Sequence, residues 1–249
     1  MEHLRVEVTR DGAVRTIRVD RQEKRNALSR EMFDQLIELF EVAPPAAERV
    51  TVVRSEGKVF CSGIDLNERL KFGAPPLDRL CEAMKMYPLP VVLRMQGDAI
   101  AGGAFFALFS DFLVGAIGAK IWVSLVQIGL APPYYLTRKL QELTSPSMAR
   151  EMGLLGDPVT VERLALANAI VKAVPLAELD AEVERIVDRL VRNAPLSLRA
   201  IKATLTANEF VETSHADVEA LIVRARDSQD GREGVQSRLD KRVPVYKGI

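Results

Sequence analysis

The chain has 249 residues, 48% of them apolar and 27% charged, as is typical of a globular protein with one large domain or a domain and a small subdomain. The chain has 34 Lys and Arg residues and 34 Asp and Glu residues. Its net charge is therefore zero and does not indicate a surface that binds nucleic acid. Two cysteines argue against a disulfide framework and predict a reducing, cytoplasmic location. The N-terminal residues do not resemble a signal peptide, and no apolar run reaches the roughly 18 residues of a membrane span, so we expect no membrane partner.

Strand and helix signals alternate along the first half of the chain. Residues 4–20 alternate apolar and polar side chains around Asp11-Gly12, which predicts a β-hairpin. Ser29 has the position of an N-cap before a helix over 33–40. A short buried helix is predicted over 104–108, and further strands are predicted at 50–54, 91–95, 112–116 and 121–123. Such alternation predicts parallel strands joined by crossover helices.

The second half of the chain has helical spacing throughout. Helices are predicted over 146–156, 158–170 and 179–192, then from Pro195 onward and over 216–226. Only two histidines occur, His3 and His215, and no Cys/His cluster has metal-ligand spacing, so we expect no metal ion. We place His215 on the surface of the C-terminal helical region.

Two glycine-containing loops are the strongest candidates for chemistry. Residues 60–66 read Phe-Cys-Ser-Gly-Ile-Asp-Leu, and residues 97–103 read Gly-Asp-Ala-Ile-Ala-Gly-Gly directly before the buried helix. Glycine permits a positive φ or a close backbone approach. A helix start presents N–H groups and positive potential to an anion. Asp65 is expected to cap the turn that follows the first loop.

These loops, with the segment from Arg21 to Leu28, resemble the crotonase (enoyl-CoA hydratase/isomerase) superfamily. The segment resembles the family's early R-P-x-x-x-N-A-L loop, with Gln22 where proline is usual, and residues 231–244 match its usual ending. The resemblance implies an α/β fold, a crotonase-like spiral of ββα units with an α-helical C-terminal region. It places the spiral core at residues 1–190 and a helical trimerisation or lid region at 191–249.

The resemblance also implies a site. The backbone N–H groups of Ile64 and Gly102 would form an oxyanion hole for the carbonyl of an acyl-CoA thioester. Coenzyme A would be part of the substrate, and no separate cofactor is expected. A homotrimer or a dimer of trimers is implied. Contacts with coenzyme A are implied for Lys24, Arg25, Ala27, Ser62, Asp65 and Leu66, the first two pairing with phosphate.

The sequence departs from the family at two positions. When the sequence is aligned with the family pattern without gaps, Phe105 and Leu125 fall where hydratases of the family carry glutamates. Neither side chain can transfer a proton. The chain is therefore identified as a divergent member that lacks both hydratase glutamates. Phe105 and Leu125 either pack the core or, with Trp122, line an apolar substrate pocket. Glu68 and Tyr134 are the candidates for a replacement acid or base.

Three functions stay open at this point. One is hydration or isomerisation of an enoyl-CoA by non-standard residues. Another is decarboxylation of a malonyl-type CoA, in which the departing CO₂ leaves its electron pair behind and an oxyanion hole supplies most of what the reaction needs. The third is non-catalytic binding of an acyl-CoA on a retained fold, since fold does not imply function.

Overall fold

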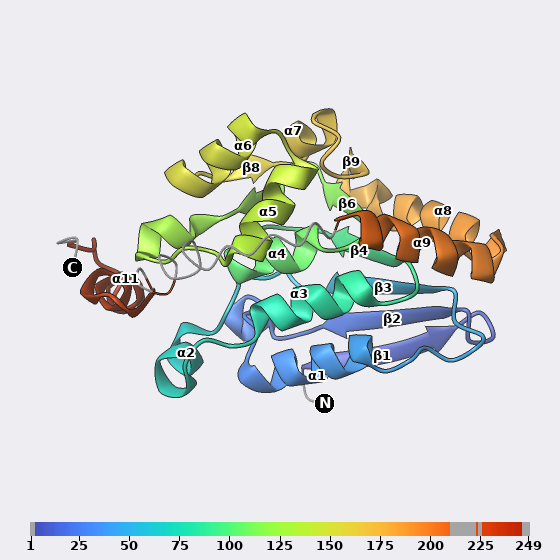
Figure 1. Ribbon diagram of the computed structural model, residues 1–249, viewed down its shortest axis with the longest axis horizontal. Helices are drawn as coiled ribbons and strands as arrows, with labels where there is room; N and C mark the ends of the chain where they lie inside the picture. The colour runs from blue at the N-terminus through green and yellow to red at the C-terminus, as the bar shows by residue number, and fades with distance from the viewer. Residues whose placement is uncertain (1–2, 210–222, 224–225, 246–249) are drawn as a thin grey trace.

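The computed structural model describes residues 3–209, 223 and 226–245, and a six-stranded sheet forms its centre (Figure 1). The strand order is β1-β2-β3-β4-β6-β9. The hairpin pair β1–β2 is antiparallel and every later pair is parallel, which confirms the predicted hairpin and parallel strands. The strands are β1 (Leu4–Thr9), β2 (Val14–Val19), β3 (Val50–Ser55), β4 (Val91–Met95), β6 (Phe112–Ala116) and β9 (Lys172–Val174).

A small second sheet, of order β5-β7-β8, lies beside the first. Its strands are β5 (Ala99–Ile100), β7 (Lys120–Trp122) and β8 (Val159–Thr160). The α-helices are α1 (Arg30–Glu41), α2 (Leu66–Phe72), α3 (Leu77–Met86), α4 (Gly102–Leu108), α5 (Tyr134–Leu143), α6 (Pro146–Arg150), α7 (Val161–Leu166), α8 (Leu179–Arg192), α9 (Pro195–Glu209) and α11 (Gln229–Leu239). Short turns of other helix types are η1 (Gln22–Lys24), η2 (Ser124–Ile128), η3 (Glu151–Leu155) and η4 (Leu176–Glu178).

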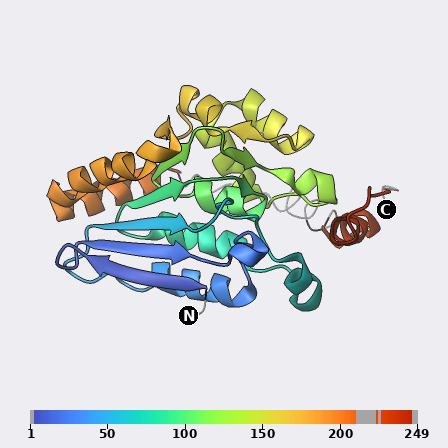
Figure 2. The same cartoon turned by 180° about the vertical axis from the view of Figure 1, so that it is seen from behind.

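The large sheet is covered on both faces, because successive strand side chains point to opposite sides. Val52 and Val92 pack in one core cluster with α8, while Val53 and Leu93 pack in the other with α1, α3 and α4. Figure 1 shows α1 and α3 across one face, and Figure 2 shows the sheet from behind. Nearly continuous apolar strands are what a parallel sheet buried on both faces requires.

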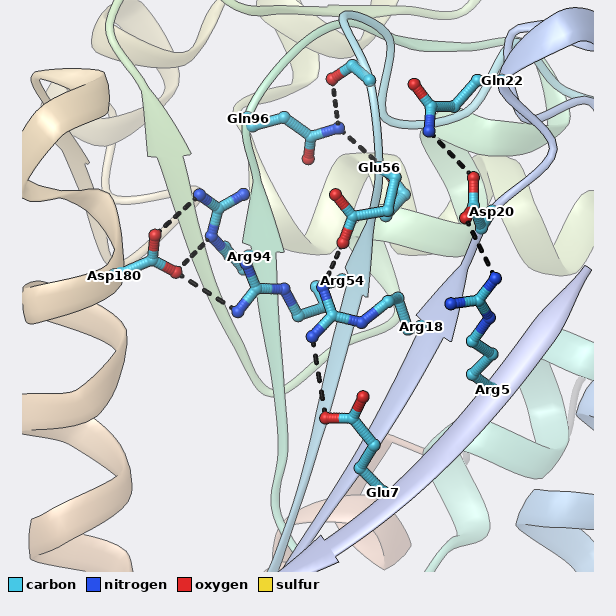
Figure 3. A network of polar contacts seen from close by, with 12 residues as sticks. Arg5, Glu7, Arg18, Asp20, Gln22, Arg54, Glu56, Arg94, Gln96 and Asp180 are labelled. Carbon is cyan, nitrogen blue, oxygen red and sulfur yellow. Dashed lines mark hydrogen bonds and ion pairs between the residues drawn. The ribbon is translucent and has the colours of Figure 1, made fainter.

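Two arginines of neighbouring strands, Arg54 and Arg94, attach α8 to the sheet (Figure 3). Arg18, Arg54 and Arg94 stand in register on β2, β3 and β4. Asp180, in the first turn of α8, accepts hydrogen bonds from Arg94 Nε at 2.6 Å and Nη2 at 2.9 Å, and lies 3.3 Å from Arg54 Nη1. The Arg94 hydrogen bonds hold the pKa of Asp180 below its usual value. Arg54 and Arg94 therefore fix where α8 begins on the sheet, while Arg18 pairs with Glu7 and Glu56.

A buried ionic cluster joins the start of β3 to the hairpin and α3. Glu48 Oε1 accepts hydrogen bonds from Thr51 Oγ1 at 2.7 Å and from Tyr87 Oη at 2.8 Å, and lies 3.2 Å from Arg15 Nε. The guanidinium carbon of Arg15 lies 4.8 Å from the ring centroid of Tyr87. Both charges are buried, so each depends on the other for its stabilisation.

The N-terminal helix prediction is confirmed and one later prediction is partly wrong. Ser29 caps α1 by accepting a hydrogen bond from Met32 N at 3.2 Å. The helix predicted over 158–170 is instead β8 followed by the short α7. Thr160 pairs with β7 and then caps α7, and Asn168 adopts a φ of 57°, which interrupts the helical path before β9.

The C-terminal helices pack at opposite ends of the long axis (Figure 1). Lys202 on α9 bonds Asp111 Oδ2 at 2.6 Å and Leu89 O at 2.9 Å, so α9 is held against the start of β4. At the other end α11 packs on η2, where a Cβ on Gly234 would lie 2.1 Å from Ile128 O. The predicted helix over 216–226 and His215 lie outside the described residues, except for 223 and 226. No described helix is long and apolar enough to cross a membrane.

Candidate active site

Three loops that are distant in sequence are joined by short backbone pairings. Leu28 pairs with Ile64, through Leu28 N to Gly63 O at 2.8 Å and Asp65 N to Leu28 O at 3.0 Å. Cys61 pairs with Ala99, and Ile100 N donates to Cys61 O at 2.8 Å. These pairings place the two glycine-containing loops against each other, with the loop before α1 beside the first of them.

Two residues that were not predicted as site residues, Arg21 and Asn26, shape the first loop. Arg21 Nη1 donates to Asp65 Oδ2 and to Ala27 O, both at 3.0 Å. Asn26 Nδ2 donates to Glu56 O at 2.7 Å and Val59 O at 2.8 Å, and its Oδ1 accepts from Arg21 N. The signal for both residues was their place as the Arg and Asn of the R-P-x-x-x-N-A-L pattern, to which we assigned no role.

The pairings leave two backbone donors unused. Neither Ile64 N–H nor Gly102 N–H has a hydrogen-bond acceptor among residues 3–209, 223 and 226–245. They belong to adjoining backbone, because a Cβ on Gly63 would lie 3.2 Å from Gly102 N and one on Gly102 would lie 3.2 Å from Ile64 Cγ1. Gly102 is the first residue of the buried α4, so its N–H has no acceptor within the helix. Both donors can therefore serve a bound oxygen atom.

Ala101 directly precedes α4 and has a strained backbone conformation. This conformation sets the orientation of Gly102. Its φ of 51° and ψ of −115° are rare for a residue with a Cβ. Ala101 N donates to Trp122 O at 2.8 Å and holds this conformation.

We expect Ala101→Gly to raise the free energy of unfolding by about 1 kcal/mol, because relief of a strained φ outweighs the added freedom of the unfolded chain. Urea unfolding measures this change. As a control, Ala104→Gly in α4 should lower stability by at least about 1 kcal/mol, since glycine is a poor helix former and a buried methyl group is lost. A loss of stability in Ala101→Gly would show that Ala101 is unstrained.

Glu68 lies close to Ile64 but already has a partner. Its Oε2 accepts a hydrogen bond from Arg30 N, at the N-terminus of α1, at 2.6 Å. A carboxylate oxygen in this position satisfies one of the N–H groups that have no acceptor within the helix. Glu68 and Ile64 both line a small recess, whose other walls are Leu28, Arg30, Arg69, Phe72, Gly73 and Pro75.

The residues expected to contact coenzyme A divide into two groups. Lys24 and Arg25 are exposed on the loop before α1, where their charges are accessible to a phosphate. Asp65 is buried, caps α2 through Asn67 N, and pairs with Arg21, so its carboxylate is structural. Ala27 is buried, and the half-buried residues are Ser62 and Leu66.

The remaining predicted site residues lie on α4, β7, η2 and α5. Phe105 is fully buried in the main core, which fits the packing alternative. Leu125 is half-buried against the same core. Trp122 Nε1 donates to Gly156 O, which fixes the indole. Tyr134 begins α5, a helix that packs against α4.

Cys61 and Cys81 are free thiols, and both are buried. Burial raises the pKa of the Cys61 thiol to about 12 and that of Cys81 well above its usual value. A neutral, buried thiol is not a nucleophile. No group of three His, Cys, Asp or Glu side chains in the described part of the chain could hold a metal ion.

The raised pKa of the buried Cys61 thiol predicts that the protein becomes less stable at alkaline pH. The thiol titrates near pH 8.5 in an unfolded chain but stays protonated to about pH 12 in the fold, so its contribution is complete below pH 8.5 and is lost above it. Between pH 9 and 11 we expect the free energy of unfolding to fall by about 1.4 kcal/mol per pH unit because of Cys61. Urea unfolding of Cys61→Ala across this range should show a shallower slope, and equal slopes would contradict the assignment.

Comparison with known proteins assigns this arrangement to a family. The enoyl-CoA hydratase/isomerase family model matches residues 9–248. The probable enoyl-CoA hydratase echA6 of Mycobacterium tuberculosis is 31% identical over 247 residues, covering 97% of this chain and 98% of that protein. The 2,3-dehydroadipyl-CoA hydratase of Escherichia coli is 27% identical over 250 residues, covering 97% and 98%. The chain belongs to the enoyl-CoA hydratase/isomerase family.

Solved structures have the same fold. A methylmalonyl-CoA decarboxylase in complex with 2-nitronate-propionyl-CoA matches with a TM-score of 0.89 at 22% identity, covering 99% of both chains. An enoyl-CoA hydratase from Mycobacterium avium subsp. paratuberculosis matches with a TM-score of 0.85 at 22% identity, covering 98% of both. The predicted crotonase-like α/β fold is therefore confirmed.

Proposed function

We propose that the chain binds an acyl-CoA thioester, polarises its carbonyl between Ile64 N–H and Gly102 N–H, and stabilises the enolate formed when a malonyl-type acyl group loses CO₂. The observation that carries the proposal is the pair of adjoining N–H groups with no acceptor in the described part of the chain. Two fixed donors stabilise an oxyanion more strongly than water does, because they need no reorganisation.

The groups beside these donors favour decarboxylation over hydration. Phe105 and Leu125 stand where we place the hydratase glutamates, and Phe105 is fully buried. Glu68 already accepts from Arg30 N. Hydration needs a positioned acid and base. In decarboxylation the bond between the α-carbon and the carboxylate breaks, its electron pair enters the enolate, and a solvent proton then reaches the α-carbon.

The lining of the recess beside Ile64 suits the apolar carbons of an acyl group. Leu28, Phe72 and Pro75 supply apolar walls beside Ile64. The exposed Lys24 and Arg25 are positioned on the neighbouring loop, where we propose that they pair with phosphates of coenzyme A.

We also propose that the chain assembles as a homotrimer or a dimer of trimers through its C-terminal helical region. Leu196, Ile201 and Leu205 on α9 are exposed large apolar side chains, and surfaces of this kind favour association. Light scattering after size-exclusion chromatography gives the mass, and a monomer would reject this proposal.

Mass spectrometry of reactions with malonyl-type, 2-enoyl, 3-enoyl and β-keto thioesters tests the function. Loss of CO₂ from the malonyl-type substrate is the expected result. A gain of water by the 2-enoyl thioester would overturn the proposal in favour of hydration through Glu68 or Tyr134. Binding of thioesters without any product would instead favour a non-catalytic acyl-CoA binding protein.

A further inference from the structure

The recess beside Ile64 contains a guanidinium that the proposed mechanism does not use. Arg69 lies in the last turn of α2 and lines the recess together with Ile64 and Leu28. Its side chain is half-buried. A half-buried arginine without a partner is unusual, because burial of a charge costs free energy unless a partner is present.

Arg69 has no such partner within the described residues, where its side chain forms no hydrogen bond or ion pair. The carboxylates around it are already engaged. Glu68 accepts from Arg30 N at 2.6 Å. Asp227 is held by Arg226 through two bonds, Nε to Oδ1 at 2.7 Å and Nη2 to Oδ2 at 3.0 Å.

The electrostatic surroundings of Arg69 favour an added anion. Burial lowers the pKa of Arg69, the positive charge of Arg226 lowers it further, and the charge of Asp227 offsets part of this effect. An anion in the recess would compensate the buried charge, and a carboxylate matches the two-pronged donor geometry of a guanidinium.

We propose that Arg69 binds a carboxylate on the acyl group, so that the site selects carboxylated acyl-CoA thioesters over uncharged ones of the same shape. This inference rests on the proposed function, because a thioester carbonyl at Ile64 N–H places the acyl group beside Ile64, and Arg69 lines the same recess as Ile64. The phosphates of coenzyme A are assigned to Lys24 and Arg25 instead. The apolar walls contact the carbons between the carbonyl and the carboxylate.

The proposal gives Arg69 a role in binding and not in the chemical step. In loss of CO₂ the carboxylate charge disappears as the transition state forms, so an ion pair to it stabilises the bound substrate more than the transition state. Removal of Arg69 should therefore raise KM for a malonyl-type substrate and leave kcat unchanged or higher. Arg69 is a specificity residue by this argument.

The test compares thioesters that differ only in charge. Malonyl-CoA pairs with isovaleryl-CoA and succinyl-CoA with isocaproyl-CoA, since a methyl-branched end has the shape of a carboxylate. Dissociation constants are measured by stopped-flow competition, which reports binding before turnover. Arg69→Met should weaken binding of the carboxylated member of at least one pair by about 10- to 100-fold and change the uncharged member by less than about three-fold. Arg69→Lys should restore part of the difference.

Lys71→Met is the matched control, because Lys71 lies on α2 but is exposed, with its Nζ 4.9 Å from the Phe72 ring centroid. It should preserve the discrimination. Equal weakening of both members by Arg69→Met would overturn the inference and assign Arg69 to a phosphate or to the fold. Equal binding of both members by the unaltered protein would also overturn it. Discrimination by a chain that releases no CO₂ would uphold the inference and reject the proposed reaction.

Discussion

Gly102→Pro is expected to slow turnover of a malonyl-type thioester by about 10²- to 10³-fold, the usual effect of removing one oxyanion donor. Proline lacks the N–H, and the first position of a helix is where its ring is best tolerated. Gly102 occupies that position in α4. The carbonyl should therefore lose one of its two hydrogen bonds, and circular dichroism checks the fold because proline also restricts the backbone of Ala101.

Gly102→Ala separates the loss of the donor from the addition of bulk. It keeps the N–H, and its Cβ would lie 3.2 Å from Ile64 Cγ1, so it tests crowding alone. The Raman carbonyl stretch of a bound thioester gives a readout that does not depend on turnover. The stretch should move toward its free value in Gly102→Pro and much less in Gly102→Ala. Full activity in Gly102→Pro would rule out this N–H as a catalytic donor.

Glu48→Gln should lower the free energy of unfolding by about 3 kcal/mol, because it leaves the buried Arg15 without a counter-charge. Glu48 is 2% exposed and Arg15 is 9% exposed. Glutamine is nearly the same size and can still accept from Thr51 and Tyr87, so the change in charge dominates. Urea unfolding monitored by circular dichroism measures the difference.

Glu41→Gln is the matched control for this substitution. Glu41 accepts from Arg79 Nε at 2.8 Å and Nη2 at 2.7 Å, but both side chains are largely exposed. Exposed ion pairs contribute little to stability, so its urea midpoint should hardly move. Similar effects of the two substitutions would mean that burial does not determine the strength of the Glu48 cluster.

Local patterns were sufficient to predict most of the framework. The alternation over residues 4–20, the Ser29 cap and the apolar strands depend on neighbours in the chain, and the structure confirms them. The error over 158–170 arose where Thr160 pairs with β7, a contact between segments far apart in sequence. Helical spacing does not report such pairing.

The sequence by itself determined the parallel α/β architecture, the family resemblance and the two loops around Ile64 and Gly102, because periodicity and glycine patterns are local. Only the tertiary structure decided what the charged and apolar side chains near those loops do. Glu68 caps α1 through Arg30, which is 38 residues away, and Phe105 lies wholly inside the core. Arg69 is left unpaired within the described residues by the engagement of Glu68 and Asp227. Burial and pairing depend on which distant segments pack together, and no single segment of sequence contains that information.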